Sequence, residues 1–128
     1  MKAVIVAVVI ALATSGCVTV SGARGIHQDR NLLTREEFSQ LGYRTAYDAV
    51  QLLRPFWLIS RGPTEYLPSP KDQPQVFVND MWEGGLDVLQ TIRLDGVREI
   101  RFLPIGETVM RFGAGYPSGG IHVRIGGN

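Results

Sequence analysis

The sequence predicts a small α+β domain, in which short strands and helices alternate in a mixed α/β order. The chain has 128 residues, which is the size of one domain. Its residues are 45% hydrophobic and 20% charged, as in chains that fold around a core. Apolar runs of strand length alternate with amphipathic stretches of helical spacing. The net charge of +1 gives no reason to expect a nucleic-acid partner.

Residues 1–16 are typical of a secretory signal peptide. Lys2 gives a positive start, and residues 3–13 form an unbroken apolar run. A membrane-spanning helix needs about 20 apolar residues, so this run is too short for an anchor. A buried N-terminal helix is the alternative, but the run has no polar face. We therefore expect this segment to be an address that is removed.

The end of the signal resembles a bacterial lipobox, a small residue followed by cysteine, at Ser15-Gly16-Cys17. Thr14 stands where that pattern usually has Leu, and cleavage nearby by ordinary signal peptidase is the alternative. The resemblance implies that Cys17 is acylated and that outer-membrane lipid is its partner. Val18 after the cysteine suits delivery to the outer membrane. The sequence has one cysteine, so no disulfide or cysteine metal site is expected.

Residues 17–33 are predicted to be a tether, because polar residues and glycines are scattered there without periodicity. The folded domain is predicted to be residues 34–126. Thr34 and Glu37 have the spacing of a capping box, which predicts a short helix from Arg35 to about residue 42.

A second helix is predicted after Thr45, with an apolar stripe along one face. Pro55 ends it, because the residue before a proline avoids helical angles. Residues 56–60 are an apolar run of strand length. Residues 63–75 hold four prolines and are predicted to be an exposed loop.

The second half of the domain continues the alternation. Residues 75–78 are predicted to form a strand that ends at Asn79-Asp80, and residues 86–92 a short helical stretch. Residues 97–103 alternate as a strand up to Pro104. Residues 107–112 allow one or two helical turns.

A last strand is predicted at residues 121–125. Ile121, Val123 and Ile125 would share one face, with His122 and Arg124 on the outward face. Gly113 and Gly120 belong to a glycine-rich elbow before this strand, where we expect backbone angles that alanine avoids.

This order resembles the plug domain of TonB-dependent outer-membrane receptors over roughly residues 34–126. Four segments carry the resemblance: Arg61-Gly62, Val76-Phe77-Val78-Asn79-Asp80, residues 97–103 and residues 112–125. Asn79-Asp80 departs from the Asp-Gly of that family. In receptors the plug lies inside a barrel that follows it in the same chain. No barrel follows here, so we expect no transport by this chain alone.

Candidate catalytic residues are few. His27 falls in the tether, and His122 is predicted to lie outward on the last strand, with Ser60 or Ser118 as the nucleophile that a triad would need. Neither serine lies in a nucleophile elbow. The acidic residues near the hairpin do not have the spacing of a Ca²⁺ loop; they are Asp80, Glu83 and Asp87. No metal or cofactor is expected.

Binding is the better-supported function class. Four aromatic residues are predicted to cluster around the strand ends and the proline loop: Phe56, Trp57, Tyr66 and Trp82. If Tyr66 and Trp82 are exposed, they are natural anchors for a partner. Four arginines are candidates for one side of the sheet, either as a binding face or as solvated ion pairs: Arg98, Arg101, Arg111 and Arg124.

The sequence thus predicts a non-catalytic, lipid-anchored, plug-like binding module at the periplasmic face of the outer membrane. Its partner would be a separate outer-membrane barrel, as an accessory to a TonB-dependent receptor, or a periplasmic protein. The alternative is a small hydrolase, secreted to the periplasm, that uses His122 or a pair of carboxylates.

Overall fold

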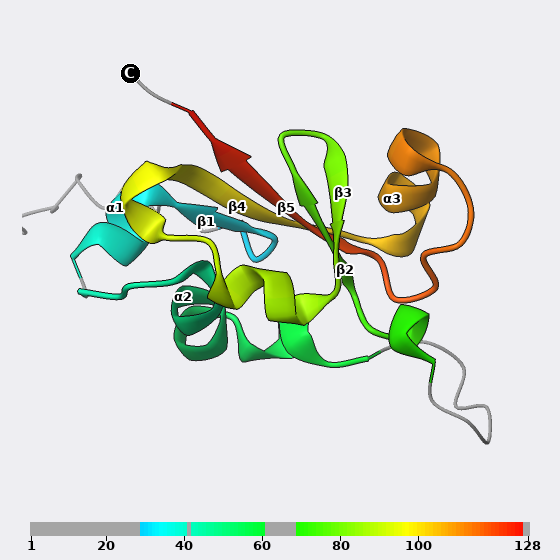
Figure 1. Cartoon of the computed structure of the whole chain (residues 1–128), viewed down its shortest axis with the longest axis horizontal. Coiled ribbons are helices and arrows are strands. Elements are labelled where there is room, and N and C mark those ends of the chain that lie inside the picture. The colour runs from blue at the N-terminus through cyan, green and yellow to red at the C-terminus, as the bar shows by residue number, and fades with distance from the viewer. Residues whose placement is uncertain (1–28, 41, 61–68, 127–128) are drawn as a thin grey trace, which may run out of the picture.

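The computed structural model describes residues 29–40, 42–60 and 69–126. They form a five-stranded mixed sheet with the strand order β1-β4-β5-β2-β3 (Figure 1). The central strands β2 and β5 run parallel, and the other neighbours are antiparallel. The α+β class predicted from the sequence is confirmed. The five strands are β1 (Leu32–Thr34), β2 (Gln75–Val78), β3 (Met81–Gly84), β4 (Val97–Leu103) and β5 (Gly120–Ile125).

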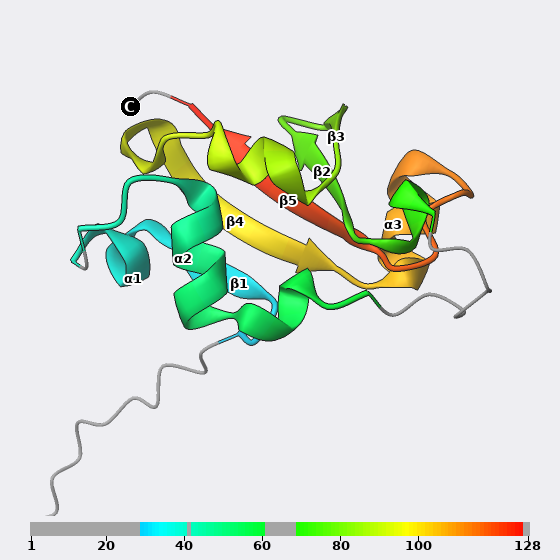
Figure 2. The ribbon, with the colours of Figure 1, turned by 60° about the horizontal axis from the view of Figure 1, so that its bottom comes forward.

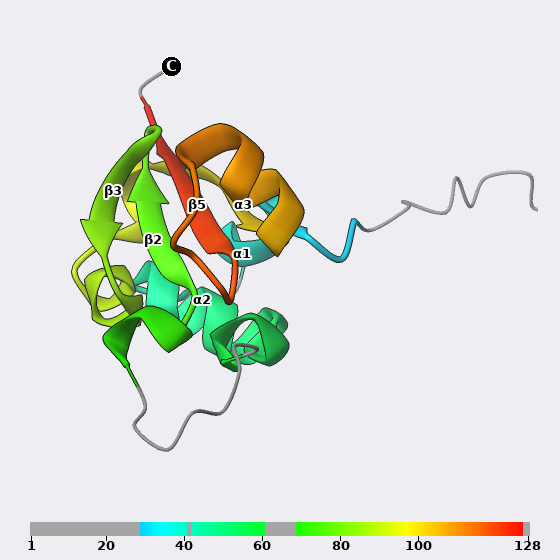
Figure 3. The same cartoon turned by 90° about the vertical axis from the view of Figure 1, so that its right-hand side faces the viewer.

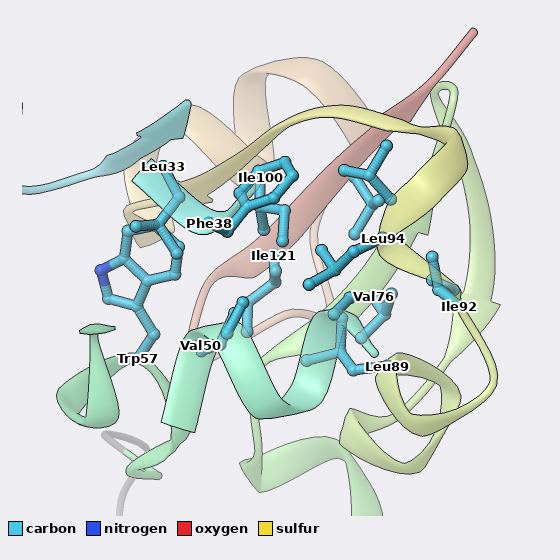
Figure 4. Close-up of a cluster of buried hydrophobic side chains, with 14 of the residues drawn as sticks. Leu33, Phe38, Val50, Trp57, Val76, Leu89, Ile92, Leu94, Ile100 and Ile121 are labelled. Carbon is cyan, nitrogen blue, oxygen red and sulfur yellow. The ribbon is translucent and has the colours of Figure 1, made fainter. Parts of the chain in front are cut away.

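The main core lies on one face of the sheet. Helix α2 (Ala46–Leu53) and the 3-10 helices η1 (Pro55–Leu58) and η3 (Leu86–Gln90) pack there, with α1 (Arg35–Ser39) at one end (Figures 1 and 2). Figure 4 shows the side chains that these elements bury against the strands. The fully buried members include Leu33, Val50, Trp57, Leu89, Ile100 and Ile121.

Helix α3 (Ile105–Phe112) covers part of the opposite face (Figure 3). The Phe77 ring of β2 is buried there, stacked on Phe112 with ring centroids 3.8 Å apart. Tyr116 meets the same ring edge-on at 5.2 Å. A small aromatic cluster therefore holds α3 over β2 and β5.

Leu32 and Leu33, predicted to end the tether, instead form an edge strand of the sheet. Leu33 pairs with Ile100 of β4 and is completely buried. The prediction was wrong because a single apolar pair before Thr34 gives no periodicity, whereas the sheet offers it a partner strand. The domain therefore starts before residue 34.

The helices largely follow their capping signals. The Thr34 N–H donates to the Glu37 carboxylate at 2.9 Å at the start of α1. The Thr45 hydroxyl accepts from the Asp48 N–H at 3.2 Å at the start of α2. α1 ends three residues before Gly42, which takes a φ of +66° in the turn that follows.

The strand predicted at residues 56–60 is wrong. Residues 55–58 form η1, with Pro55 at its first turn, where a proline suits a helix. This turn directs Trp57 into the core, where its indole stacks on Phe102 at 6.0 Å, and leaves Phe56 exposed. An apolar run of this length does not distinguish a strand from a buried helical turn.

The last two elements were predicted with small errors. α3 begins at Ile105, directly after Pro104, rather than at residue 107. β5 lies where it was predicted. Gly113 takes a positive φ of 90°, as expected. Gly120 does not; it is required for space, since a Cβ there would lie 2.7 Å from the Phe77 ring.

Candidate functional site

The hairpin of β2 and β3 forms the outer edge of the sheet. Asn79 and Asp80 connect the strands with φ values of 46° and 69°. Two consecutive positive φ values are the signature of the tight two-residue turns that suit a twisted hairpin. The strand predicted at residues 75–78 ends at Asn79-Asp80 as expected, but β3 was not predicted. The turn signal was present, since strand-length segments flank these two residues.

The exposed face of this hairpin is built around Trp82. We call Asp80, Met81, Trp82 and Glu83 the hairpin edge. The Trp82 side chain is 59% exposed, and Met81 beside it is exposed as well. The Trp82 indole N–H donates to the Gln75 side-chain oxygen at 3.2 Å, which fixes the ring against β2. The exposure that the binding prediction required of Trp82 is thus present.

The backbone of Trp82 is also turned outward. Val78 and Met81 flank the two-residue turn, and Phe77 and Trp82 form the next pair. Antiparallel pairs alternate between hydrogen-bonded and non-hydrogen-bonded types, and the pair that closes such a turn is of the first type. The Trp82 N–H and C=O therefore point away from β2, toward the side where the described sheet has no further strand.

His122 of β5 is hydrogen-bonded to the hairpin turn. It was predicted to lie outward, but its side chain is only 2% exposed. It does point away from Ile121 and Val123, as predicted; the error was that α3 covers this face, with the Phe112 ring 6.4 Å away.

The imidazole Nε2 of His122 accepts the N–H of Asp80 at 3.2 Å, and the Asp80 carboxylate lies at the same distance. Burial lowers the pKa of His122 from its ordinary 6.5, although the Asp80 carboxylate acts in the opposite direction. The hydrogen bond between the Asp80 N–H and Nε2 ties the histidine to the hairpin turn.

A second anchor fixes the other residue of the turn. The Asn79 side-chain oxygen accepts the N–H of Ile125 at 2.9 Å. The backbone N–H of Asn79 donates to the Val123 carbonyl at 3.0 Å. Both turn residues are thus bonded to β5. The hairpin edge is presented on a rigid support.

Helix α3 approaches the hairpin turn at Arg111 and carries exposed apolar side chains of its own. The Arg111 guanidinium lies 4.0 Å from the Asp80 carboxylate. Met110 beside it is 90% exposed, and Ile105 and Val109 are exposed too. The hairpin edge and α3 thus each carry exposed apolar side chains.

The predicted arginine side of the sheet forms in part. Arg101 lies opposite His122 in the register of β4 and β5, and Arg124 follows His122 two residues later on the same face. Arg111 of α3 lies 4.0 Å from the Asp80 carboxylate, and Arg124 pairs with Glu99 at 3.5 Å. A charged hollow of about 450 Å³ lies where β1 and β5 end and β4 begins. Its lining residues are Thr34, Arg35, Glu36, Arg98, Glu99, Arg124 and Gly126. The pKa of Glu36 is lowered there, first by a backbone hydrogen bond to its carboxylate. Acids and bases alternate around this hollow, so it presents no field of one sign.

The predicted serines and His122 have different hydrogen-bond partners. The Ser60 and Ser118 hydroxyls both donate to the carbonyl oxygen of Asp72. The acidic residues of the hairpin edge are exposed at a turn and a strand. Within the described residues, no group of three or more His, Cys, Asp or Glu side chains is placed to hold a metal ion.

The predicted aromatic cluster does not form as such. Trp57 is buried in the core and donates its indole N–H to the Arg30 carbonyl, whereas Trp82 lies at the opposite edge of the sheet. Tyr66, His27 and Cys17 lie outside the described residues, as do the signal peptide and most of the tether.

In the part of the chain that the structure describes, no helix has the length and apolar character to cross a membrane. Comparisons with protein-family models, with curated proteins and with solved structures find no match to this chain.

Proposed function

We propose that the chain is a non-catalytic binding module of the cell envelope, anchored by lipid at Cys17 to the periplasmic face of the outer membrane. The observation that carries the proposal is the hairpin edge, where an exposed tryptophan and an exposed methionine stand on a rigid edge strand. Tryptophan is among the residues that contribute most to protein interfaces. The hydrogen bond to Gln75 orders the ring beforehand, so binding costs less entropy.

The outward backbone of Trp82 adds a second means of recognition. An extended segment of a partner protein can pair with a free strand edge, while its side chains read the neighbouring pockets. β3 is short and irregular opposite Val76 and Phe77, which limits non-specific pairing with other chains. The resemblance of residues 97–125 to receptor plugs suggests that an outer-membrane barrel is the partner.

The hydrolase alternative receives less support from the geometry. A histidine acting as general base must reach the substrate, but His122 is buried and its Nε2 accepts the Asp80 N–H. The predicted serines are engaged with the Asp72 carbonyl. These observations favour binding over catalysis.

Site-specific photo-crosslinking tests the binding proposal. A benzophenone amino acid replaces Trp82 in the full chain, which is expressed in the bacterium that it comes from. In a control chain the same amino acid replaces Arg93, whose side chain is exposed. We expect a light-dependent adduct with one envelope protein at position 82 and none at position 93. Equal adducts at both positions, or none at position 82, would contradict the proposal.

The captured protein then allows a quantitative test. Titration of the purified partner should show a Kd that rises by about 30-fold or more in Trp82→Ala, as expected for a central interface tryptophan. Arg93→Ala serves as the matched control and should leave the Kd unchanged.

A further inference from the structure

A second exposed apolar surface lies far from the hairpin edge. Leu52 in the last turn of α2 is 64% exposed, Phe56 in η1 is exposed, and Ile59 directly after η1 is 60% exposed. We call these three residues the tether-side patch. They are close together along the chain, and nothing in the main core requires them.

This patch lies where the described chain begins. Trp57, next to Phe56, donates its indole N–H to the Arg30 carbonyl at 3.2 Å. Arg54 donates to the Leu32 carbonyl at 3.4 Å. Figure 2 shows the first described residues beside the turn that follows α2. The segment that carries the patch is thus bonded directly to the residues that enter β1.

The position of Cys17 sets how far this corner can lie from a lipid anchor. Eleven residues lie between Cys17 and Asp29, and the twelve Cα-to-Cα steps of a fully extended chain span at most about 3.3–3.6 Å each, or roughly 40 Å in all. The corner that the tether enters is the part of the described domain nearest to Cys17 along the chain.

The charge of the segment suits a lipid surface. Residues 49–60 contain no acidic residue and one arginine, Arg54. Asp48, one helical turn before Leu52, is half-buried, and its carboxylate accepts the Thr45 N–H at 3.2 Å. The described chain begins with an acidic residue, Asp29, three residues before β1. Its carboxylate accepts the Asn31 N–H at 3.0 Å. Bacterial and other anionic membranes repel acidic surfaces. The hairpin edge, by contrast, places Asp80 and Glu83 around its tryptophan.

We infer that the tether-side patch rests on the lipid surface to which Cys17 anchors the chain. The inference depends on the proposed anchor and adds the orientation of the domain. β1 and β3 are the two opposite edges of the sheet, separated by four strand spacings, or about 19 Å. With the β1 corner on the lipid, the hairpin edge faces away from the membrane and is open to a partner.

Fluorescent labelling of the acylated full chain tests this orientation. The sequence has one cysteine, which acylation blocks, so a cysteine introduced at one position takes a single environment-sensitive dye. Labels are placed by Leu52→Cys and Ile59→Cys in the patch, and by Met110→Cys and Trp82→Cys as matched exposed controls. The protein is reconstituted in vesicles of phosphatidylethanolamine and phosphatidylglycerol, and iodide quenching is measured.

Binding to vesicles should reduce the iodide quenching of the patch labels by roughly half or more, compared with the same protein without vesicles. An interfacial apolar face sits about 5–10 Å into the headgroup region, where iodide does not reach it. The control labels should keep their quenching. Vesicle-bound protein with all four labels equally quenched would overturn the inference while leaving the anchor intact. If iodide also fails to quench the patch labels when no vesicles are present, the inference is overturned too, because another protein segment then covers the patch. Protein that fails to float with vesicles would refute the anchor itself, and the inference with it.

Discussion

Gly120→Ala tests the packing that supports the hairpin edge. Gly120 lies at the start of β5, next to β2. An added Cβ would lie 2.7 Å from one carbon of the Phe77 ring, 3.0 Å from another and 3.3 Å from the Gln75 carbonyl oxygen. Because the Phe77 ring is stacked on Phe112 at 3.8 Å, it has little room to move. The substitution pushes on the cluster that holds α3 in place.

Two opposing effects set the magnitude. Overpacking a buried site costs about 1–3 kcal/mol. Replacing a glycine inside a strand gains about 0.5–1 kcal/mol in backbone entropy. We therefore expect Gly120→Ala to lower the free energy of unfolding by about 0.5–2 kcal/mol.

Urea unfolding, followed by the fluorescence of the buried Trp57, measures this change. With a slope of about 1–3 kcal/mol per molar urea, a change of this size moves the midpoint measurably. Gly106→Ala is the matched control, because a Cβ at that helical position meets no atom within 4 Å. It should stabilise the protein by about 0.5–1 kcal/mol. Equal stabilisation by both substitutions would refute the packing described here.

Three further predictions follow from the same structure. Burial lowers the pKa of His122 from 6.5, so the folded state binds this proton less readily than the unfolded chain; its contribution to stability is present above about pH 6.5 and lost as the pH falls below it. The loss of unfolding free energy between about pH 7.5 and pH 5.5 should shrink in His122→Gln, whose side-chain oxygen still accepts the Asp80 N–H; an unchanged pH dependence would contradict this. Arg54→Met should cost about 1–3 kcal/mol in urea unfolding, because it leaves the partly buried Glu37 carboxylate without its 3.1 Å partner; a cost no larger than that of Arg93→Met at the exposed Asp95 pair would argue against it. Thr45→Ala should cost about 1 kcal/mol by removing the cap of α2, and a neutral result would show that the cap is not needed.

Much of the fold could be predicted from local signals. The cap at Thr45, the stop at Pro55 and the alternation in residues 97–103 and 121–125 are short-range patterns, and each has its expected element. Capping, proline stereochemistry and side-chain alternation act within a few residues, which is why they can be read from one sequence.

The errors arose where tertiary contacts decide. Leu33 became part of a strand because β4 offers it a partner, and residues 55–58 became a helical turn because the core takes up Trp57. β3 was the exception, since the Asn79-Asp80 turn between two strand-length segments gave a usable local signal.

For the candidate site, the sequence could propose Trp82 as an anchor but could not place it. Its exposure depends on β3 being the edge of the sheet, which only the strand order determines. His122 was misplaced for the same reason. Alternation assigns it correctly to the face opposite Ile121, but only the position of α3 decides that this face is covered.

The central claim is that lipid at Cys17 anchors this binding module, and metabolic labelling with radioactive palmitate tests it most directly. The wild-type chain and Cys17→Ala are expressed in a bacterial host, and their label and membrane fractionation are compared. We predict label and membrane association in the wild type and neither in Cys17→Ala. Palmitate incorporation that persists in Cys17→Ala, or a wild-type chain that carries no label, would contradict the claim.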